Sequence, residues 1–266
     1  MFDYLVNFAQ SYGKRLHGHA LIWYKQSTYS MPTWVQNFQG TKEEWKQIMK
    51  EYITDVVTRY KGKVASWDVV NEAVKDDGTF RPASECVWTK NIGVPEYIDW
   101  AFQCAHEADP NALLFYNDYG HEYSSAKRVA INNLIKGMKE RGVPIHGYGL
   151  QMHTNVERAV GDLRNAILTA AQTGLKVHVS ELDIAVNKNN VASLVYSDEL
   201  KQKQYLSYKA VAEAMADVPE GQQYGITTWG VADPNSWLYA NPDWPLPFDG
   251  NYQRKPAYQG LVDGFY

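Results

Sequence analysis

The chain has 266 residues and a net charge of −4, so it lacks the basic surplus expected of proteins that bind nucleic acids or anionic membranes. Hydrophobic residues make up 45% and charged residues 21%, which is typical of a globular protein rather than a disordered one. Two cysteines exclude a disulfide scaffold and a four-cysteine zinc site. No run of about 18 apolar residues predicts a transmembrane helix. Aromatic residues reach 14%, which suits either a core or a groove for a flat-faced ligand such as a sugar.

The chain opens within a folded pattern. Leu5, Phe8 and Ala9 stand at helical spacing and predict an amphipathic helix, and these residues show no basic leader, apolar stretch or cleavage site. The segment Arg15–Trp23 is the first predicted strand.

A long helix follows a loop that contains Pro32. Thr41 to Glu44 fits a capping box at its start, and Gly62 follows its end. Its apolar stripe, at steps of three and four residues, comprises Trp45, Ile48, Met49, Tyr52, Ile53, Val56, Val57 and Tyr60.

Strands and helices then alternate. The further predicted strands are Val64–Glu72, Ala112–Tyr119, Ile145–His153, Lys176–Ile184, Tyr224–Val231 and Leu246–Asp249. The helices are Glu96–Ala108, Ser125–Arg141, Val160–Thr173, Glu199–Ala216 and a closing helix with Tyr258, Leu261 and Val262. This alternation predicts an α/β fold with a parallel sheet. No Gly-rich phosphate loop follows a strand, which argues against a nucleotide-binding sheet. No linker divides the chain, so a single domain over residues 1–266 is expected.

Polar and acidic residues gather where the predicted strands end. The ends read WDVVNE at 67–72, NDY at 117–119, QMH at 151–153, SELD at 180–183 and TWG at 228–230. The carboxyl ends of barrel strands form the active site of a (β/α)₈ barrel, although an acid there can also cap a helix or pair with an arginine. Glu72 and Glu181 stand on different strands. Two carboxylates about 5–5.5 Å apart make a retaining glycosidase, and about 6.5–9.5 Å apart an inverting one.

These motifs together resemble glycoside hydrolase family 10, the retaining endo-β-1,4-xylanases with a (β/α)₈ TIM barrel. The resemblance rests on WDVVNEA at 67–73, NDY at 117–119, GLQMH at 149–153, SELD at 180–183 and the TWG segment that continues to Trp237. GHALIW at 18–23 and KPAY at 255–258 also fit. The matches run in order from about residue 2 to the C-terminus.

The resemblance implies a role for each matching residue. Glu72 is the expected general acid/base and Glu181 the expected nucleophile, with His153 holding the nucleophile and Asp183 orienting His153. The other residues expected to bind substrate are His19 and Gln26 on the glycone side, Trp34 after the proline of that loop, Asn71 at the 2-hydroxyl, Tyr119 on the aglycone side, and Gln151, Trp229 and Trp237. Strand alternation predicts that Gln151 and His153 share a face.

The sequence departs from the family pattern in two places. The family's opening strand, with its Glu-Asn pair and Lys, has no counterpart before residue 1, which predicts a barrel lacking its first strand. Tyr24 stands where the family usually has histidine, and the loop from there to Pro32 is longer than usual. We expect Tyr24 to reshape or weaken binding at the cleavage subsite.

The resemblance implies an endo-β-1,4-xylanase that acts on xylan and xylo-oligosaccharides with no cofactor or metal. Because polymeric xylan does not enter cells, we expect a secreted protein, and we also expect a monomer. Two alternatives remain at this point: a catalytically impaired barrel that binds xylo-oligosaccharides, and the same chemistry on a β-glucan. His17 and His19 share a strand face, but no third metal ligand is evident. Glu122 is interpreted as a solvated or capping residue.

Overall fold

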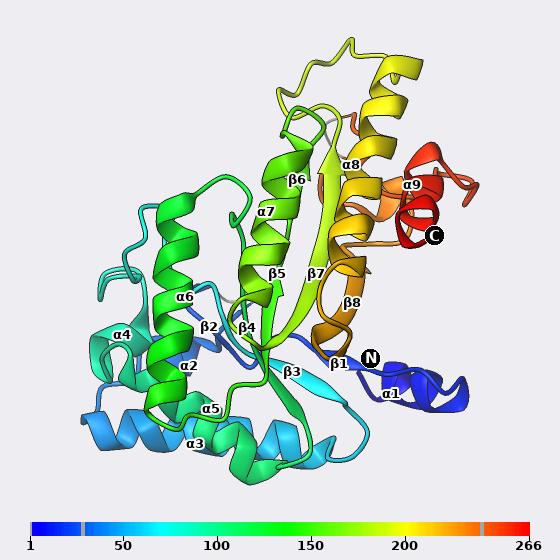
Figure 1. The fold of residues 1–266 in the computed structure, drawn as a ribbon. Helices are drawn as coiled ribbons and strands as arrows, with labels where there is room; N and C mark the ends of the chain where they lie inside the picture. The colour runs from blue at the N-terminus through cyan, green and yellow to red at the C-terminus, as the bar shows by residue number, and fades with distance from the viewer. Residues whose placement is uncertain (1, 28–29, 240–241) are drawn as a thin grey trace. The chain divides into compact units, whose positions relative to one another are not determined.

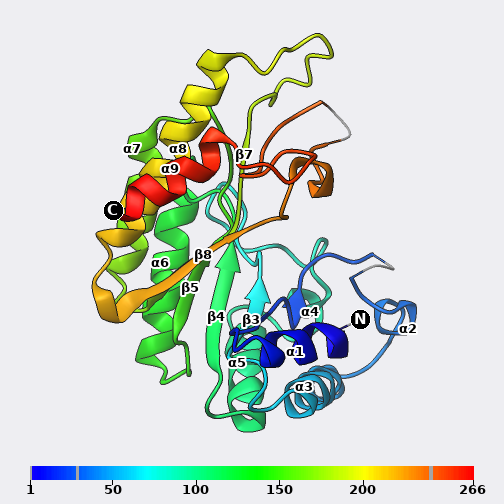
Figure 2. The same cartoon turned by 90° about the vertical axis from the view of Figure 1, so that its right-hand side faces the viewer.

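The protein is described by a computed structural model that covers residues 2–27, 30–239 and 242–266. Its contacts divide the chain into two compact units, which Figures 1 and 2 show from two sides. The first unit comprises the described residues up to Asp118 together with Val129–Gly147. The second comprises Tyr119–Arg128 and the described part of Tyr148–Tyr266. Helix α6 (Ser125–Glu140) and strand β5 (Gly147–Leu150) each contain residues of both units.

Parallel strands form the centre of the first unit. Strands β1 (His17–Gly18) and β2 (Ile22–Trp23) both pair with β3 (Ser66–Asn71), and β3 also pairs with β4 (Leu113–Asp118). The predicted strand Arg15–Trp23 is therefore two short strands with a break between them. In β1, position 18 requires glycine, because a Cβ there would lie 2.1 Å from the ring of Trp67.

Helices cover the strands of the first unit. They are α1 (Phe2–Ser11), α2 (Thr33–Gln36), α3 (Lys42–Arg59), α4 (Val87–Asn91) and α5 (Glu96–Ala108). The capping box predicted at Thr41 and Glu44 is present at the start of α3. Figure 1 shows α3 running beside α5, against which it packs. From the predicted stripe, Trp45, Met49, Ile53 and Val57 are buried.

The predicted inward face of α1 is partly wrong. Leu5 is 44% and Phe8 50% exposed, whereas Val6 and Ala9 are buried. Phe2, on the same side as Val6, packs edge-on against Tyr60 with ring centroids 4.5 Å apart. Helix α1 carries apolar residues on more than one side, so their spacing alone does not determine which side is buried.

The second unit is built around β7 (Lys176–Ala185), which is buried along almost its whole length. Strands β6 (His153–Asn155) and β8 (Gln223–Thr228) pair with it in parallel, and β5 neighbours it in the sheet. Helices α7 (Val160–Ala171) and α8 (Asp198–Ala216) run beside β7 (Figure 1). Helix α9 (Pro256–Phe265) packs against α8, as Figure 2 shows.

The predicted strand Leu246–Asp249 is wrong. Phe248 makes only isolated bridges with Ala232 and Arg254. Pro245 and Pro247 flank Leu246 and have no N–H to donate to a sheet. The N–H of Leu246 donates instead to Asp233, which stands in the short helix η2 (Asp233–Asn235). A second short helix, η1 (Glu220–Gln222), precedes β8.

The segment between η2 and α9 is anchored by a buried ion pair. The Nζ atom of Lys255 lies 3.0 Å from Asp233 Oδ2 and also donates to the carbonyls of Trp244 and Leu246. These contacts tie the residues just before α9 to Asp233 of η2 and to the main chain at Trp244 and Leu246. None of the described helices combines the length and the apolar character needed to cross a membrane.

Candidate active site

In the second unit, Glu181 lies at the centre of a hydrogen-bonded array. It is 4% exposed, and its Oε2 atom lies 3.2 Å from Nε2 of His153. The other imidazole nitrogen, Nδ1, lies 3.0 Å from Oδ2 of Asp183. Trp237 donates its indole N–H to the same Asp183 oxygen at 2.8 Å. The parallel register that pairs His153 with Asp183 brings these side chains together.

The array keeps His153 protonated at neutral pH. Burial alone would lower the pKa of this histidine, but hydrogen bonds to Asp183 and Glu181 raise it to about 10. A cationic imidazolium therefore lies between two acids and fixes the direction of the Glu181 carboxyl group. This arrangement suits a carboxylate that must attack from one defined position.

We expect the contribution of His153 to the stability of the fold to decline as the pH rises above neutral. Because the folded pKa of His153 is raised, its contribution is complete below the unfolded value of about 6.5 and is lost as the pH rises through about 10. The measurement is the free energy of unfolding in urea at several pH values for the wild type and His153→Gln. The stability advantage of the wild type should narrow across this window, and a constant difference would contradict the assignment.

The two predicted tryptophans flank His153. The ring of Trp229 stands edge-on to the imidazole at 6.1 Å, and that of Trp237 at 5.7 Å. Both indoles are partly exposed, at 39% and 62% respectively. They therefore present aromatic surface next to His153, the residue that contacts Glu181, and such a surface suits a sugar-binding wall.

Gln151 and Tyr119 also lie in the second unit. The backbone carbonyl of Gln151 accepts a hydrogen bond from the N–H of Glu181 at 3.1 Å. The strand predicted over Ile145–His153 is interrupted here, because β5 ends at Leu150 and Met152 has a left-handed φ of 60°. The alternation argument for Gln151 and His153 is therefore wrong, since it requires one continuous strand. The buried Lys127 places its Nζ atom over the ring of Tyr119, 3.3 Å from the ring centroid.

In the first unit, Glu72 directly follows β3 in an unusual backbone conformation. Its φ is 58°, in the left-handed region that non-glycine residues rarely adopt. Its N–H donates to the carbonyl of Asn117 at 2.9 Å. Asn71 is buried, accepts a hydrogen bond from Asn117 at 3.0 Å, and points its own amide toward Glu72 Oε1 at 3.4 Å. The conformation thus turns the Glu72 side chain beside the predicted sugar-binding amide.

His17 and His19 both contact the carboxyl group of Asp68. Nε2 of His17 lies 3.0 Å and Nδ1 of His19 2.9 Å from the two carboxyl oxygens of Asp68, which is buried. Burial would raise the pKa of Asp68, but the two histidines hold it well below its usual range. Among the described residues, no group of three or more histidine, cysteine or acidic side chains is arranged to hold a metal ion.

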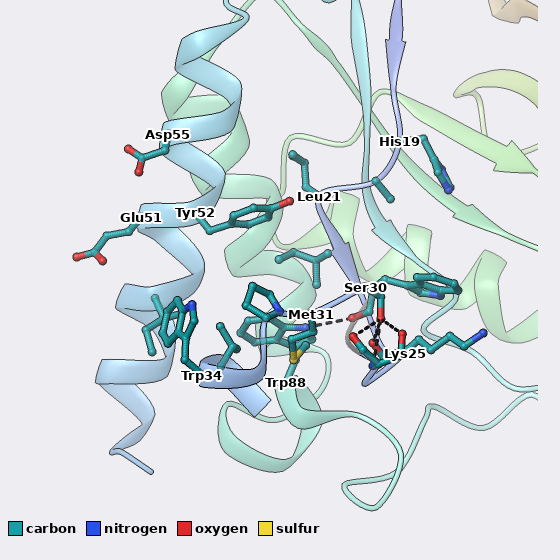
Figure 3. A pocket seen from close by; sticks show the side chains of 17 residues that line it. His19, Leu21, Lys25, Ser30, Met31, Trp34, Glu51, Tyr52, Asp55 and Trp88 are labelled. Atoms are coloured by element: carbon teal, nitrogen blue, oxygen red, sulfur yellow. Dashed lines mark hydrogen bonds between the residues drawn. The ribbon is translucent and has the colours of Figure 1, made fainter. Parts of the chain in front are cut away.

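His19 and Trp34 line the same cavity of about 920 Å³ in the first unit (Figure 3). Its wall includes Trp23, Tyr52 and Trp88, and in Figure 3 Tyr52 points from α3 toward Leu21. Gln26 is not among its lining residues and borders a second cavity of about 460 Å³. The two predicted glycone residues, His19 and Gln26, therefore border different cavities.

The sequence analysis missed the burial of two residues, one in each unit. Arg81 is buried, donates from Nε to the Glu72 carbonyl at 2.9 Å, and stacks on the Tyr24 ring at 3.6 Å. Glu122 is 3% exposed, so its interpretation as a solvated residue is wrong, and burial raises its pKa to about 7. Neither residue belongs to a strand-end pattern, and no spacing in the sequence indicates its burial.

The family model for glycosyl hydrolase family 10 matches residues 1–264. The chain belongs to this family. Solved family members share its fold: native xylanase 10B from Thermotoga maritima superposes with a TM-score of 0.87 at 35% identity, covering 99% of this chain and 78% of that one. Xylanase 10C from Cellvibrio japonicus was solved as a variant in complex with xylopentaose. It superposes with a TM-score of 0.90 at 34% identity, covering 99% of this chain and 56% of that one. These likenesses confirm the predicted (β/α)₈-barrel class.

Curated relatives carry both xylanase and glucanase names. Endo-1,4-beta-xylanase A of Cellvibrio japonicus is 38% identical over 98% of this chain, and the chain spans 46% of that relative. Beta-1,4-xylanase of Dictyoglomus thermophilum is 40% identical, with 98% of this chain and 74% of the relative covered. A protein named Exoglucanase XynX, from Acetivibrio thermocellus, is 36% identical over 98% of this chain and 24% of its own length. The chain thus spans about half the length, or less, of several curated relatives that it matches.

Proposed function

We propose that the chain is a retaining endo-β-1,4-xylanase and that residues 1–266 form one catalytic domain. The observation that supports this most directly is the array around Glu181, in which a buried carboxyl group is oriented by His153 and Asp183 and flanked by exposed indoles. Family 10 membership and the xylanase names of the relatives point to the same activity. Xylan and xylo-oligosaccharides are the proposed substrates.

The proposed reaction has two displacements. The Glu181 carboxylate attacks the anomeric carbon, the glycosidic C–O bond breaks, and the proton of the Glu72 carboxyl passes to the departing sugar oxygen. Water then attacks the anomeric carbon of the glycosyl-enzyme. Glu72 takes a proton from that water, and the Glu181 carboxylate is released. The net change is hydrolysis with retained configuration, and no cofactor or metal takes part.

The proposed substrate also bears on location and assembly. Polymeric xylan does not enter cells, so we propose that the protein acts outside the cell. We further propose a monomer without nucleic-acid or membrane partners. Size-exclusion chromatography with light scattering measures the assembly state, and a mass of twice 30.3 kDa would contradict the monomer.

Time-resolved proton NMR of the protein with xylohexaose tests the proposed function. We expect shorter xylo-oligosaccharides that first appear as the β-anomer, because two inversions at one carbon retain configuration. An initial α-anomer would contradict the roles of Glu72 and Glu181. Binding of xylohexaose by folded protein with no cleavage would instead favour the impaired, sugar-binding barrel.

A β-glucan-active enzyme is the second candidate, and the relative named Exoglucanase XynX favours it. Xylose and glucose units differ by one hydroxymethyl group, so the catalytic groups would serve either polymer. The values of kcat/KM on xylan and on mixed-linkage β-glucan distinguish them. We expect xylan to be preferred, and a higher value on β-glucan would reverse the assignment.

A further inference from the structure

The segment after Glu72 folds back on itself and brings Arg81 next to that residue. The N–H of Arg81 donates to the carbonyl of Ala73 at 2.9 Å, and Val74 and Phe80 form an antiparallel bridge within the loop. Nε of Arg81 then donates to the carbonyl of Glu72 at 2.9 Å. A buried guanidinium is thus attached to the main chain of the predicted acid/base.

This attachment matters because Glu72 holds a conformation that its own residue type disfavours. At φ = 58° the Cβ atom crowds the neighbouring carbonyl, and such residues persist only where surrounding contacts hold them. On the C-terminal side, the N–H of Ala73 donates to the Tyr116 hydroxyl at 3.1 Å, and that of Val74 donates to Asp118 at 3.3 Å. The contact from Arg81 fixes the carbonyl of Glu72 itself.

Tyr24 in turn supports Arg81. The guanidinium carbon lies 3.6 Å from the centroid of the Tyr24 ring, which is a close cation–π distance. Nη1 of Arg81 also donates to Glu85 at 3.2 Å, so the guanidinium is held from two sides. The residue that stands where histidine is usual in the family therefore contacts the arginine that binds the Glu72 carbonyl.

We propose that Arg81, stacked on Tyr24, is a positioning residue that holds Glu72 in the orientation needed for proton transfer. The inference rests on the proposed function. It gives Tyr24 a role in the acid/base step rather than in sugar binding alone. Neither residue needs to touch the substrate, because both act through the main chain of Glu72.

The test compares kcat/KM on two substrates that differ in their need for an acid. Xylohexaose has a poor leaving group that must be protonated, whereas 2,4-dinitrophenyl β-xylobioside releases a stable phenolate without protonation. We expect Arg81→Met to lower kcat/KM on xylohexaose by about 10–100-fold and on the aryl substrate by less than about threefold. Tyr24→Ala should show the same selective loss at about tenfold, and Tyr24→Phe, which keeps the ring, should restore most of it.

The ratio of the two kcat/KM values does not depend on the folded fraction of the sample, so partial unfolding of a variant leaves it unchanged. Trp100→Leu is the matched control, because it removes another cation–π contact of the first unit, with Lys46 at 4.5 Å. Its ratio should equal that of the wild type. Equal losses on both substrates for Arg81→Met and Tyr24→Ala, or no loss, would overturn the inference alone. A wild-type chain that turned over neither substrate would overturn the proposed function and the inference with it.

Discussion

Replacing Glu181 with glutamine is expected to lower kcat on xylohexaose by about 10⁴-fold or more, because a neutral amide does not form the glycosyl-enzyme. The amide keeps the shape of the side chain and can still contact His153, which lies 3.2 Å from Glu181 Oε2. The variant should therefore fold. The loss should be the same on xylohexaose and on the aryl xylobioside, since both need the nucleophile.

Initial rates of reducing-sugar release measure the effect of Glu181→Gln, with circular dichroism to verify folding. Glu199→Gln provides the matched control, because it makes the same chemical change at an exposed glutamate that pairs with Lys203 on α8. That variant should keep wild-type rates. Substantial xylanase activity in Glu181→Gln would remove Glu181 from the nucleophile role and leave the family assignment intact.

Replacing Glu72 with alanine is expected to lower kcat/KM on xylohexaose by about 10²–10⁴-fold, the usual contribution of a general acid. The same variant should keep kcat/KM on 2,4-dinitrophenyl β-xylobioside within about tenfold, because the aryl leaving group departs without a proton. Its glycosyl-enzyme should accumulate, since water lacks a base to activate it. Azide needs no such base and should speed turnover by forming the β-xylobiosyl azide.

Steady-state kinetics on both substrates, with and without azide, measure this pattern. Glu107→Ala, at an exposed glutamate paired with Lys50, is the control and should not respond to azide. Equal losses of kcat/KM on the two substrates, with no azide product, would assign Glu72 a role other than proton transfer. An α-configured azide would contradict the retaining mechanism.

The regular elements were the most predictable part of the fold. The helix α5 has the predicted bounds, and the capping box at Thr41 marks the start of α3, because local spacing and caps determine both. The sequence did not determine which side of α1 is buried. Leu5 and Val6 lie on different sides of the helix and both are apolar, but only Val6 is buried. It also misassigned the segment at Leu246, whose N–H bonds to a side chain of η2 rather than to a strand.

The candidate site was predictable where it follows strand ends. His153, Glu181 and Asp183 lie together because two neighbouring parallel strands carry them in register. Arg81 could not be found in this way, since a turn of the loop returns it to Glu72. The left-handed conformation of Glu72 was equally hidden, because glutamate gives no local signal for it.

That conformation has a consequence for directed evolution of this protein. Glycine adopts a φ of 58° without the crowding that a Cβ atom causes, so the backbone at position 72 is better suited to glycine than to the glutamate it carries. A library selected for heat resistance alone would be drawn toward losing Glu72, and the members without it would cleave xylan poorly. Stability and turnover therefore have to be selected together at this position. At Gly18, by contrast, selection for stability alone keeps the residue already present, because a Cβ there would lie 2.1 Å from the ring of Trp67.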